Sequence, residues 1–145
     1  MLRENKGFTL IELLLVISII SLFSSILLPI NKGIYDKVLL RITAREIKAA
    51  LHMAQELSID ESKNYCVELV DNTFHIRERV VGSQIVYRKK INDRIKIRSE
   101  SDVRITYNRN GVTNYGMFVL HNKENMRIKI DVLIGTGKVR ISKIY

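Results

Sequence analysis

The chain has 145 residues, a formal net charge of +9 at pH 7 and a single cysteine. This length allows one domain of ordinary size, and a single cysteine excludes an internal disulfide framework. No paired Cys or His spacing indicates a zinc site, so we expect neither a metal nor another cofactor.

An apolar segment, residues 8–30, follows a short basic leader and contains one charged residue, Glu12. At about 1.5 Å per residue a helix over this segment covers about 34 Å, which matches a bilayer's hydrocarbon thickness. We therefore predict one membrane-spanning helix. A carboxylate in hydrocarbon is costly unless it has a partner, which makes Glu12 a candidate functional residue. The small residue near the junction, Gly7, precedes the apolar run, whereas a secretory signal peptide is cleaved after its apolar run.

An amphipathic continuation of the helix is predicted over residues 31–63. Pro29 and Gly33 predict a bend before it, because proline removes a backbone donor and clashes with the preceding turn. We interpret Glu46 as the edge of the packed face. A spacing of three or four residues assigns to that face Tyr35, Leu39, Ile42, Glu46, Ala50, Met53 and Leu57.

An alternating pattern begins after residue 64 and predicts half-buried strands within residues 74–77, 94–98, 103–107, 126–132 and 138–141. Turn residues at 71–72, 82–83, 110–111 and 135–137 favour antiparallel hairpins. Cys66 lies in an apolar run and is expected to be a buried thiol. The pattern predicts an α+β fold, with a long N-terminal helix packed on a mostly antiparallel β-sheet or small sandwich in a β-rich domain of residues 64–145.

The sequence KGFTLIE, residues 6–12, followed by an uncharged run to Pro29, resembles the processing and assembly signal of type IV pilins and pseudopilins. The resemblance implies that a prepilin peptidase removes residues 1–7, cutting between Gly7 and Phe8, and N-methylates Phe8. It also implies that Glu12 offsets the freed amine of a neighbouring subunit's Phe8, which would set the register between helices.

By this resemblance the chain would be a structural subunit of a pilus or pseudopilus. It would wait as a single-pass protein of a prokaryotic cytoplasmic (inner) membrane with its C-terminal domain exported, and would then enter a filament at the cell surface or in the periplasm. Its partners would be the peptidase, other pilin or pseudopilin subunits and the membrane. The motif does not distinguish protein secretion, DNA uptake and surface pili.

The C-terminal sequence GTGKVRI, residues 135–141, resembles the closing strand of H-type minor pseudopilins and related minor pilins. The absence of a cysteine pair near the C-terminus also favours a minor rather than a major subunit.

The positive charge is concentrated in the β-rich part: residues 77–109 hold ten basic and four acidic side chains. Such a surface is typical of a polyanion binder, and the alternative function is a DNA-binding minor pilin that uses Lys138, Arg140 and Lys143 as first candidates for phosphate contact. Two other interpretations are that the charges maintain solubility or that they bind an acidic protein.

No catalytic constellation is recognisable, so we expect no enzyme. The histidines, His52, His75 and His121, are scattered, and there is neither a Gly-x-Ser-x-Gly elbow nor a phosphate-binding glycine-rich loop.

Overall fold

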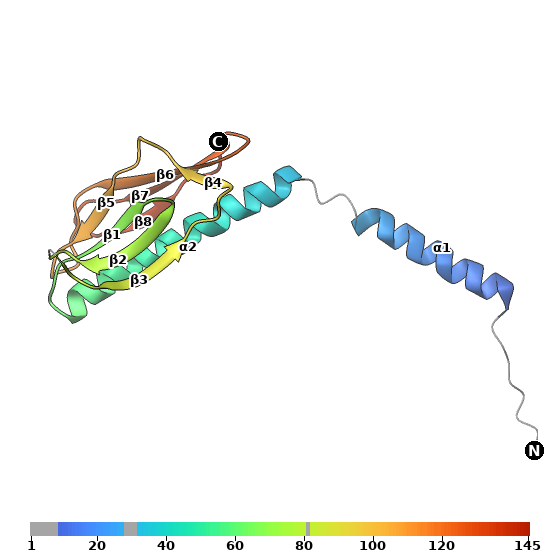
Figure 1. Cartoon of the computed structure of the whole chain (residues 1–145), viewed down its shortest axis with the longest axis horizontal. Helices are drawn as coiled ribbons and strands as arrows, with labels where there is room; N and C mark the ends of the chain where they lie inside the picture. Colours follow the sequence, from blue (N-terminus) through green and yellow to red (C-terminus); the bar gives the residue numbers. More distant parts are fainter. Residues whose placement is uncertain (1–8, 28–31, 81) are drawn as a thin grey trace, which may run out of the picture. The chain divides into compact units, whose positions relative to one another are not determined.

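The computed structural model describes residues 9–27, 32–80 and 82–145. The chain divides into two compact units, Met1–Lys32 and Gly33–Tyr145. The first contains α1 (Leu10–Leu27), and the second contains nearly all of α2 (Lys32–Asp60) and all of the strands (Figure 1). The hydrophobic core lies entirely in the second unit.

In the part of the chain that the structure describes, eight strands form two antiparallel sheets. Their bounds are β1 (Tyr65–Val70), β2 (Thr73–Glu78), β3 (Ile85–Lys90), β4 (Ile95–Ile97), β5 (Arg104–Tyr107), β6 (Gly116–Asn122), β7 (Arg127–Val132) and β8 (Val139–Ile141). One sheet has the strand order β3-β2-β1-β5 and the other β4-β6-β7-β8. The predicted α+β fold is therefore confirmed, and its strands form two four-stranded sheets.

The β1–β2 connection shows how local sequence sets the register. Val70 pairs with Thr73, which leaves a turn of two residues, Asp71 and Asn72, with φ values of 49° and 56°. Asp and Asn tolerate this left-handed conformation, and two such residues in succession match the right-handed twist of a tight hairpin. The hairpin fixes which side chains of β1 and β2 share a face.

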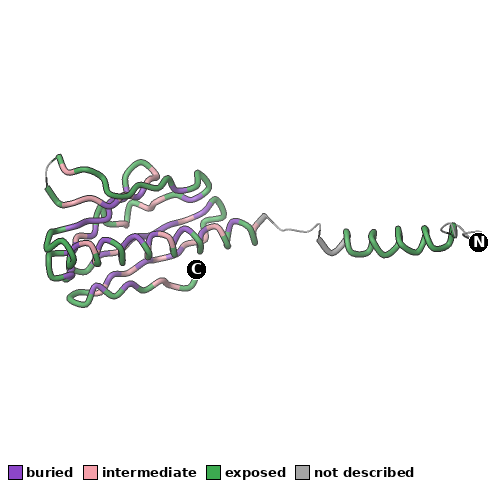
Figure 2. Tube along the Cα trace, turned by 90° about the horizontal axis from the view of Figure 1, so that it is seen from below, coloured by how far each residue is buried: buried purple, intermediate pink, exposed green. Residues whose placement is uncertain are grey.

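The core is formed by one face of α2 and the inward faces of both sheets. Figure 2 shows buried and exposed positions alternating along the helix and along several strands. Phe74, Tyr107 and Phe118 are the largest buried side chains, at 1%, 0% and 0% exposure. Burying an aromatic side chain of this size typically contributes about 1.5–3 kcal/mol or more, so packing stabilises this domain without a disulfide.

The packed face of α2 differs from the predicted one by a single residue position. Tyr35, Ile42 and Met53 were predicted to pack but are 49%, 45% and 39% exposed. The buried positions are instead Asp36, Leu40, Thr43, Ala44, Ile47, Ala50, Leu51, Ala54 and Ser58. Two adjacent stripes of this helix contain apolar residues, and the stripe with more small side chains lets the strands approach the helix closely.

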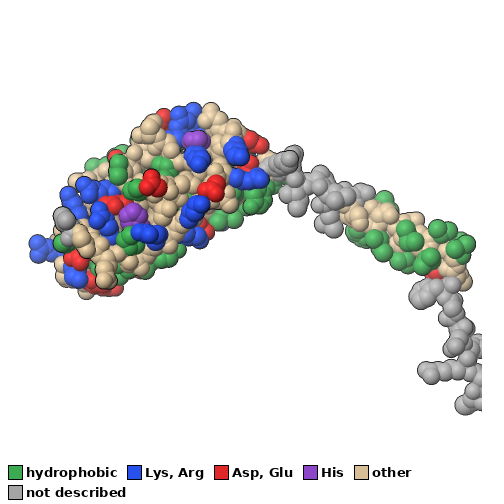
Figure 3. Space-filling model, in the orientation of Figure 1, with side chains coloured by type: hydrophobic (Ala, Val, Ile, Leu, Met, Phe, Trp, Pro, Cys, Tyr) green, Lys and Arg blue, Asp and Glu red, His purple; other side chains and the backbone are tan. Residues whose placement is uncertain are grey.

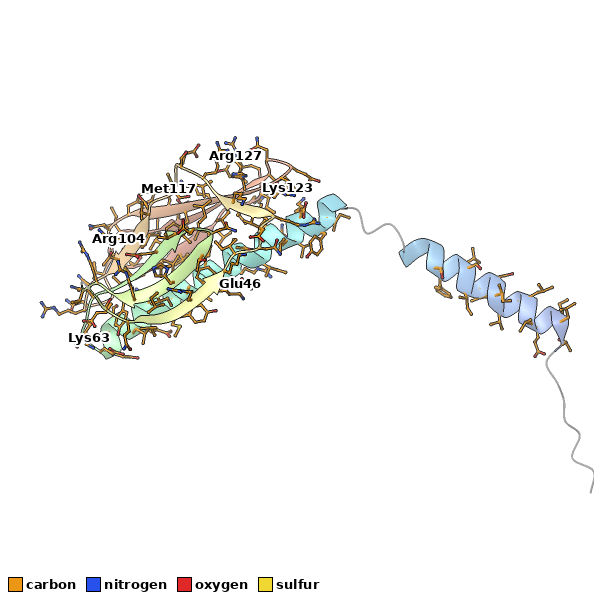
Figure 4. The ribbon with its side chains drawn as sticks, viewed as in Figure 1. Glu46, Lys63, Arg104, Met117, Lys123 and Arg127 are labelled. Atoms are coloured by element: carbon orange, nitrogen blue, oxygen red, sulfur yellow. The ribbon has the colours of Figure 1, made fainter. Side chains whose placement is uncertain are left out.

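Glu46 lies at the edge of the packed face, in accordance with its interpretation. Its carboxylate accepts a hydrogen bond from the Lys89 ammonium at 2.9 Å, which links α2 to β3 (Figure 4). Cys66 is fully buried, as predicted.

Candidate assembly site and basic surface

The start of α1 is a reciprocal hydrogen-bonded cap between Thr9 and Glu12. The Glu12 N–H donates to Thr9 Oγ1 at 3.3 Å. Glu12 Oε2 accepts from the Thr9 N–H at 3.3 Å and from the Thr9 hydroxyl at 3.2 Å. This is the capping box that an S/T-x-x-E sequence forms, and it places a negative charge at the positive end of the helix dipole.

The capping box gives Glu12 a partner within its own chain, which the sequence analysis missed. Its signature was readable as Thr9-Leu10-Ile11-Glu12. Both hydrogen bonds from Thr9 go to Oε2, and Oε1 accepts none from the residues that the structure describes. The two predicted processing residues, Gly7 and Phe8, lie outside the described residues.

Beyond its cap, α1 presents apolar side chains on every side. Leu10, Ile11, Leu22 and Phe23 are 64% to 76% exposed, and the hydroxyl of Ser18 donates to the Leu14 carbonyl at 2.8 Å. A helix that is apolar all round is normally surrounded by lipid or protein.

Within the ranges that the structure describes, no helix is both long enough and apolar enough to cross a membrane. Both ends of the predicted span, residues 8–30, fall outside those ranges, as does the predicted bend at Pro29. The single membrane span therefore stays a prediction.

A second exposed apolar surface lies on α2. Ile34, Val38, Ile42 and Met53 are 59%, 49%, 45% and 39% exposed. The first three repeat every fourth residue and so lie on one side of the helix. We refer to these four residues as the exposed α2 stripe.

The outer face of the β3-β2-β1-β5 sheet carries a cluster of ionisable groups around Glu68. Arg77 binds this carboxylate through two nitrogens, Nε at 3.0 Å and Nη2 at 2.9 Å. His75 Nε2 lies 3.0 Å from it and Arg104 Nη1 3.7 Å. The register explains this convergence, because Glu68 pairs with His75 on one side and with Arg104 on the other. We call these four residues the Glu68 cluster.

Electrostatics in the Glu68 cluster favour the charged forms of Glu68 and Arg77. Burial disfavours the Glu68 carboxylate, whose side chain is 9% exposed, but the hydrogen bonds from Arg77 and His75 outweigh this cost and lower its pKa. The hydrogen bond to Glu68 raises the pKa of Arg77 in turn. Cys66 lies beneath the cluster, and burial together with the Glu68 charge raises the pKa of its thiol to about 11.

A surface hollow of about 360 Å³ adjoins the Glu68 cluster. Its lining residues are Arg77, Arg79, Val80, Gly82 and Arg104, and we call it the arginine hollow. A neighbouring hollow of about 220 Å³ shares Arg79 and Arg104 and adds Thr106, Thr113, Asn114 and Tyr115. None of the described residues that line either hollow is acidic.

The residues predicted to contact phosphate lie on the other sheet. Arg140 is in β8 and pairs with Asp131, and Lys138 and Lys143 flank that strand. All three are exposed. They do not line the arginine hollow or the neighbouring hollow described above, and their role in binding stays a prediction.

The histidines are separated as well. His75 belongs to the Glu68 cluster, whereas His121 contacts the backbone carbonyl of Asn122 at 3.2 Å. Among the described residues, no group of three or more His, Cys, Asp or Glu side chains is placed to hold a metal ion.

The features above agree with three comparisons. Residues 2–28 match the prokaryotic N-terminal methylation motif. The competence protein ComGD of Bacillus subtilis (strain 168) is 27% identical over 145 residues, which cover 98% of this chain and 96% of that protein.

Two solved structures share the fold. The minor pseudopilin EpsH of the type 2 secretion system of Vibrio cholerae superposes with a TM-score of 0.59, at 11% identity over 71% of this chain and 95% of that one. The type IV minor pilin FimU of Pseudomonas aeruginosa gives a TM-score of 0.60, at 11% identity over 73% of this chain and 92% of that one. At this identity the two structures establish the fold alone.

This chain therefore combines the prokaryotic N-terminal methylation motif with the fold of minor pilins and pseudopilins. It is a structural subunit of the pilus and pseudopilus class, as the sequence predicted.

Proposed function

We propose that this chain is a minor subunit of a pseudopilus that serves DNA uptake. The support for this system, rather than protein secretion or a surface pilus, is the similarity to a protein named for competence over almost the whole length of both chains. The role is structural and not catalytic.

The subunit begins as a precursor in the cytoplasmic membrane. A prepilin peptidase removes residues 1–7 and methylates the new amine of Phe8, residues 8–30 hold the chain in the membrane, and the domain is exported. The methylation motif over residues 2–28 supports the processing step. The apolar surface on all sides of α1 supports a lipid environment before assembly and a helical one afterwards.

The capping box at the start of α1 is the structural observation that supports the assembly step of this proposal. It orients the Glu12 carboxylate at the helix terminus, next to the position where cleavage would free an amine, and it uses one oxygen. The other oxygen, Oε1, can accept a hydrogen bond from the ammonium of a neighbouring subunit. In a low-dielectric helix bundle such a pair is strongly favoured over two isolated charges, so it fixes the register of otherwise featureless apolar helices.

The exposed α2 stripe supports a second contact between neighbouring subunits, in addition to the one proposed at Glu12. Its apolar residues face away from the domain core, and a neighbouring helix can cover them without any change in the domain.

The test uses the organism that makes the chain, with its gene deleted and then restored. We expect deletion to abolish DNA uptake, restoration to recover it, and the restored protein to be found in the sheared surface fraction with methyl-Phe8 at its terminus by mass spectrometry. Normal uptake without the protein would overturn the role in competence. A full-length precursor in the surface fraction would overturn the processing and assembly route.

A further inference from the structure

We propose that the arginine hollow binds the phosphate groups of a nucleic-acid strand, through Arg77, Arg79 and Arg104. This inference goes beyond the proposed function, because a subunit that only assembles into a filament needs no anion site. It also differs from the prediction made from sequence, which selected basic residues of the other sheet.

The arginines of the hollow are positioned before any ligand arrives. Arg77 is held by two hydrogen bonds to Glu68, and Arg104 lies 3.7 Å from the same carboxylate on the opposite strand. The carboxylate is itself fixed in β1, between the two strands that carry the arginines. Fixing long side chains in advance removes much of the entropy cost of binding. Glu68 is thus a positioning residue of the site.

The arginine hollow carries more positive than negative charge, because three arginines line it and no described acidic residue does. Elsewhere on the domain some basic side chains have an acidic partner, such as Lys89 with Glu46 and Lys129 with Asp131, whereas others, Arg88 among them, have no ion pair with a described residue. Here Arg77 and Arg104 share the single carboxylate of Glu68, and Arg79 has no ion pair with any described residue. Basic side chains that only keep a sheet soluble can be spread over its surface, whereas Arg77 and Arg104 both lie next to the buried carboxylate of Glu68. Figure 3 shows that basic side chains outnumber acidic ones on the face of the domain in view.

The chemistry of the lining favours phosphate. Guanidinium groups present two parallel N–H donors, which match the oxygens of a phosphate. Arg104 extends from β5 toward solvent, with half of its side chain exposed (Figure 4), so its free donors are accessible. The absence of acidic side chains among the described lining residues removes a source of repulsion.

The adjoining hollow indicates a strand rather than a single ion. Two arginines are common to both hollows, so consecutive phosphates can follow one another past them. The second hollow adds hydroxyl and amide groups and Tyr115, which is 50% exposed. A basic groove beside an aromatic ring is the usual arrangement for binding single-stranded nucleic acid, where a base stacks on the ring and the backbone meets the cations.

The experiment measures binding of a fluorescent single-stranded DNA to the full chain in neutral detergent, over a series of salt concentrations. The test variant carries Arg79→Gln and Arg104→Gln. The matched control carries Lys138→Gln and Arg140→Gln, which remove the same charge from the other sheet. We expect the test variant to bind about tenfold or more weakly at about 0.1 M salt, with the salt slope reduced by about 0.7 for each phosphate that the variant no longer neutralises. The affinity of the control variant should fall by less than about threefold.

Several outcomes would overturn the inference. The wild-type protein could show no salt-dependent binding of DNA. The two double variants could lose the same affinity, or polyglutamate could compete for the site as effectively as DNA does. Binding of poly(glycerol phosphate) but not of DNA would overturn the assignment to nucleic acid. Both variants should show unchanged circular dichroism and should enter filaments like the wild type, so that a failure of binding is distinguishable from a failure of assembly.

Discussion

Gly137 approaches Gln55 so closely that a Cβ on the glycine would stand 2.5 Å from the Gln55 amide nitrogen. That nitrogen donates to the carbonyl of Gly111 at 2.9 Å and to that of Thr136 at 3.1 Å. A single side chain of α2 therefore ties two loops to the helix, and it requires a residue without a side chain at position 137.

This close approach predicts that Gly137→Ala is more destabilising than Gly135→Ala. Both glycines have left-handed φ values, 64° and 79°, so each substitution has the conformational cost of about 1–2 kcal/mol. Nothing lies within 4 Å of a Cβ at Gly135, whereas at Gly137 it also meets Tyr107 at 2.9 Å. We expect an additional destabilisation of about 1–3 kcal/mol for Gly137→Ala, measured by urea unfolding. Equal destabilisation by the two substitutions would contradict the close packing.

Processing is predicted to depend on the small residue before the cut. We expect Gly7→Leu to block removal of the leader, because a bulky side chain would occupy the position next to the bond to be cleaved. The matched control Asn5→Leu places the same side chain two residues earlier and should be cut normally. Mass spectrometry of the N-terminus checks both. A shortened Gly7→Leu product would show that the cleavage site is elsewhere.

The two roles assigned to Glu12 can be separated by changing its partner. Glu12→Ala removes the carboxylate and the two hydrogen bonds it accepts, but keeps the bond from the backbone N–H of residue 12 to Thr9 Oγ1, and we expect normal cleavage but poor incorporation into filaments. Thr9→Ala removes the hydroxyl that accepts from the N–H of residue 12, at a typical cost of about 1 kcal/mol in helix stability, but keeps the carboxylate.

The amount of each variant in the sheared filament fraction measures the difference. Thr9→Ala should assemble far better than Glu12→Ala if the carboxylate pairs with a neighbouring subunit. If both variants assemble equally badly, capping alone explains the need for Glu12.

The strands that could be predicted from sequence are those with one face in the core and one in solvent. β7 alternates between half-buried and buried positions along its whole length, and period-two hydrophobicity predicts such a strand directly. β1 has five consecutive buried residues and every residue of β3 is exposed, so neither shows alternation and neither was singled out. The α2 face was misassigned because two adjacent stripes fit the same spacing.

The candidate sites also differ in how far they could be predicted from the sequence. The processing motif is contiguous, so its residues could be predicted without a structure, and they stay a prediction. The Glu68 cluster could not, because it depends on which strands neighbour β1 and on their register. A carboxylate within the apolar run of β1 was the one hint of a site that the sequence contained.

Cys66 is predicted to be unreactive in the native protein. Its thiol is fully buried, and burial and the nearby Glu68 charge raise its pKa to about 11. An ordinary thiol has a pKa of about 8.5, so the native thiolate fraction at pH 8 is more than about a hundredfold lower. We expect negligible reaction with a disulfide reagent at pH 8 and complete reaction in urea. Rapid modification without denaturant would show that the outer face opens readily.

Stability is predicted to fall in acid through Glu68. Its pKa is lower in the folded chain than the value of about 4.3 typical of an unfolded one. As the pH falls below that value, the unfolded chain takes up a proton before the folded one does, so the ion pair's contribution disappears as the pH passes through the folded pKa.

Glu68→Gln should lower the unfolding temperature at pH 7, because Arg77 and Arg104 lose their anionic partner. The gap to the wild type should narrow by about pH 3, because the unfolded chain is protonated at this position below about pH 4.3 and a protonated glutamate resembles glutamine. Glu100→Gln is the control, since that side chain is 54% exposed, and it should change little at either pH. A Glu68→Gln deficit that stays constant from pH 7 to pH 3 would mean that packing, and not charge, is what Glu68 provides.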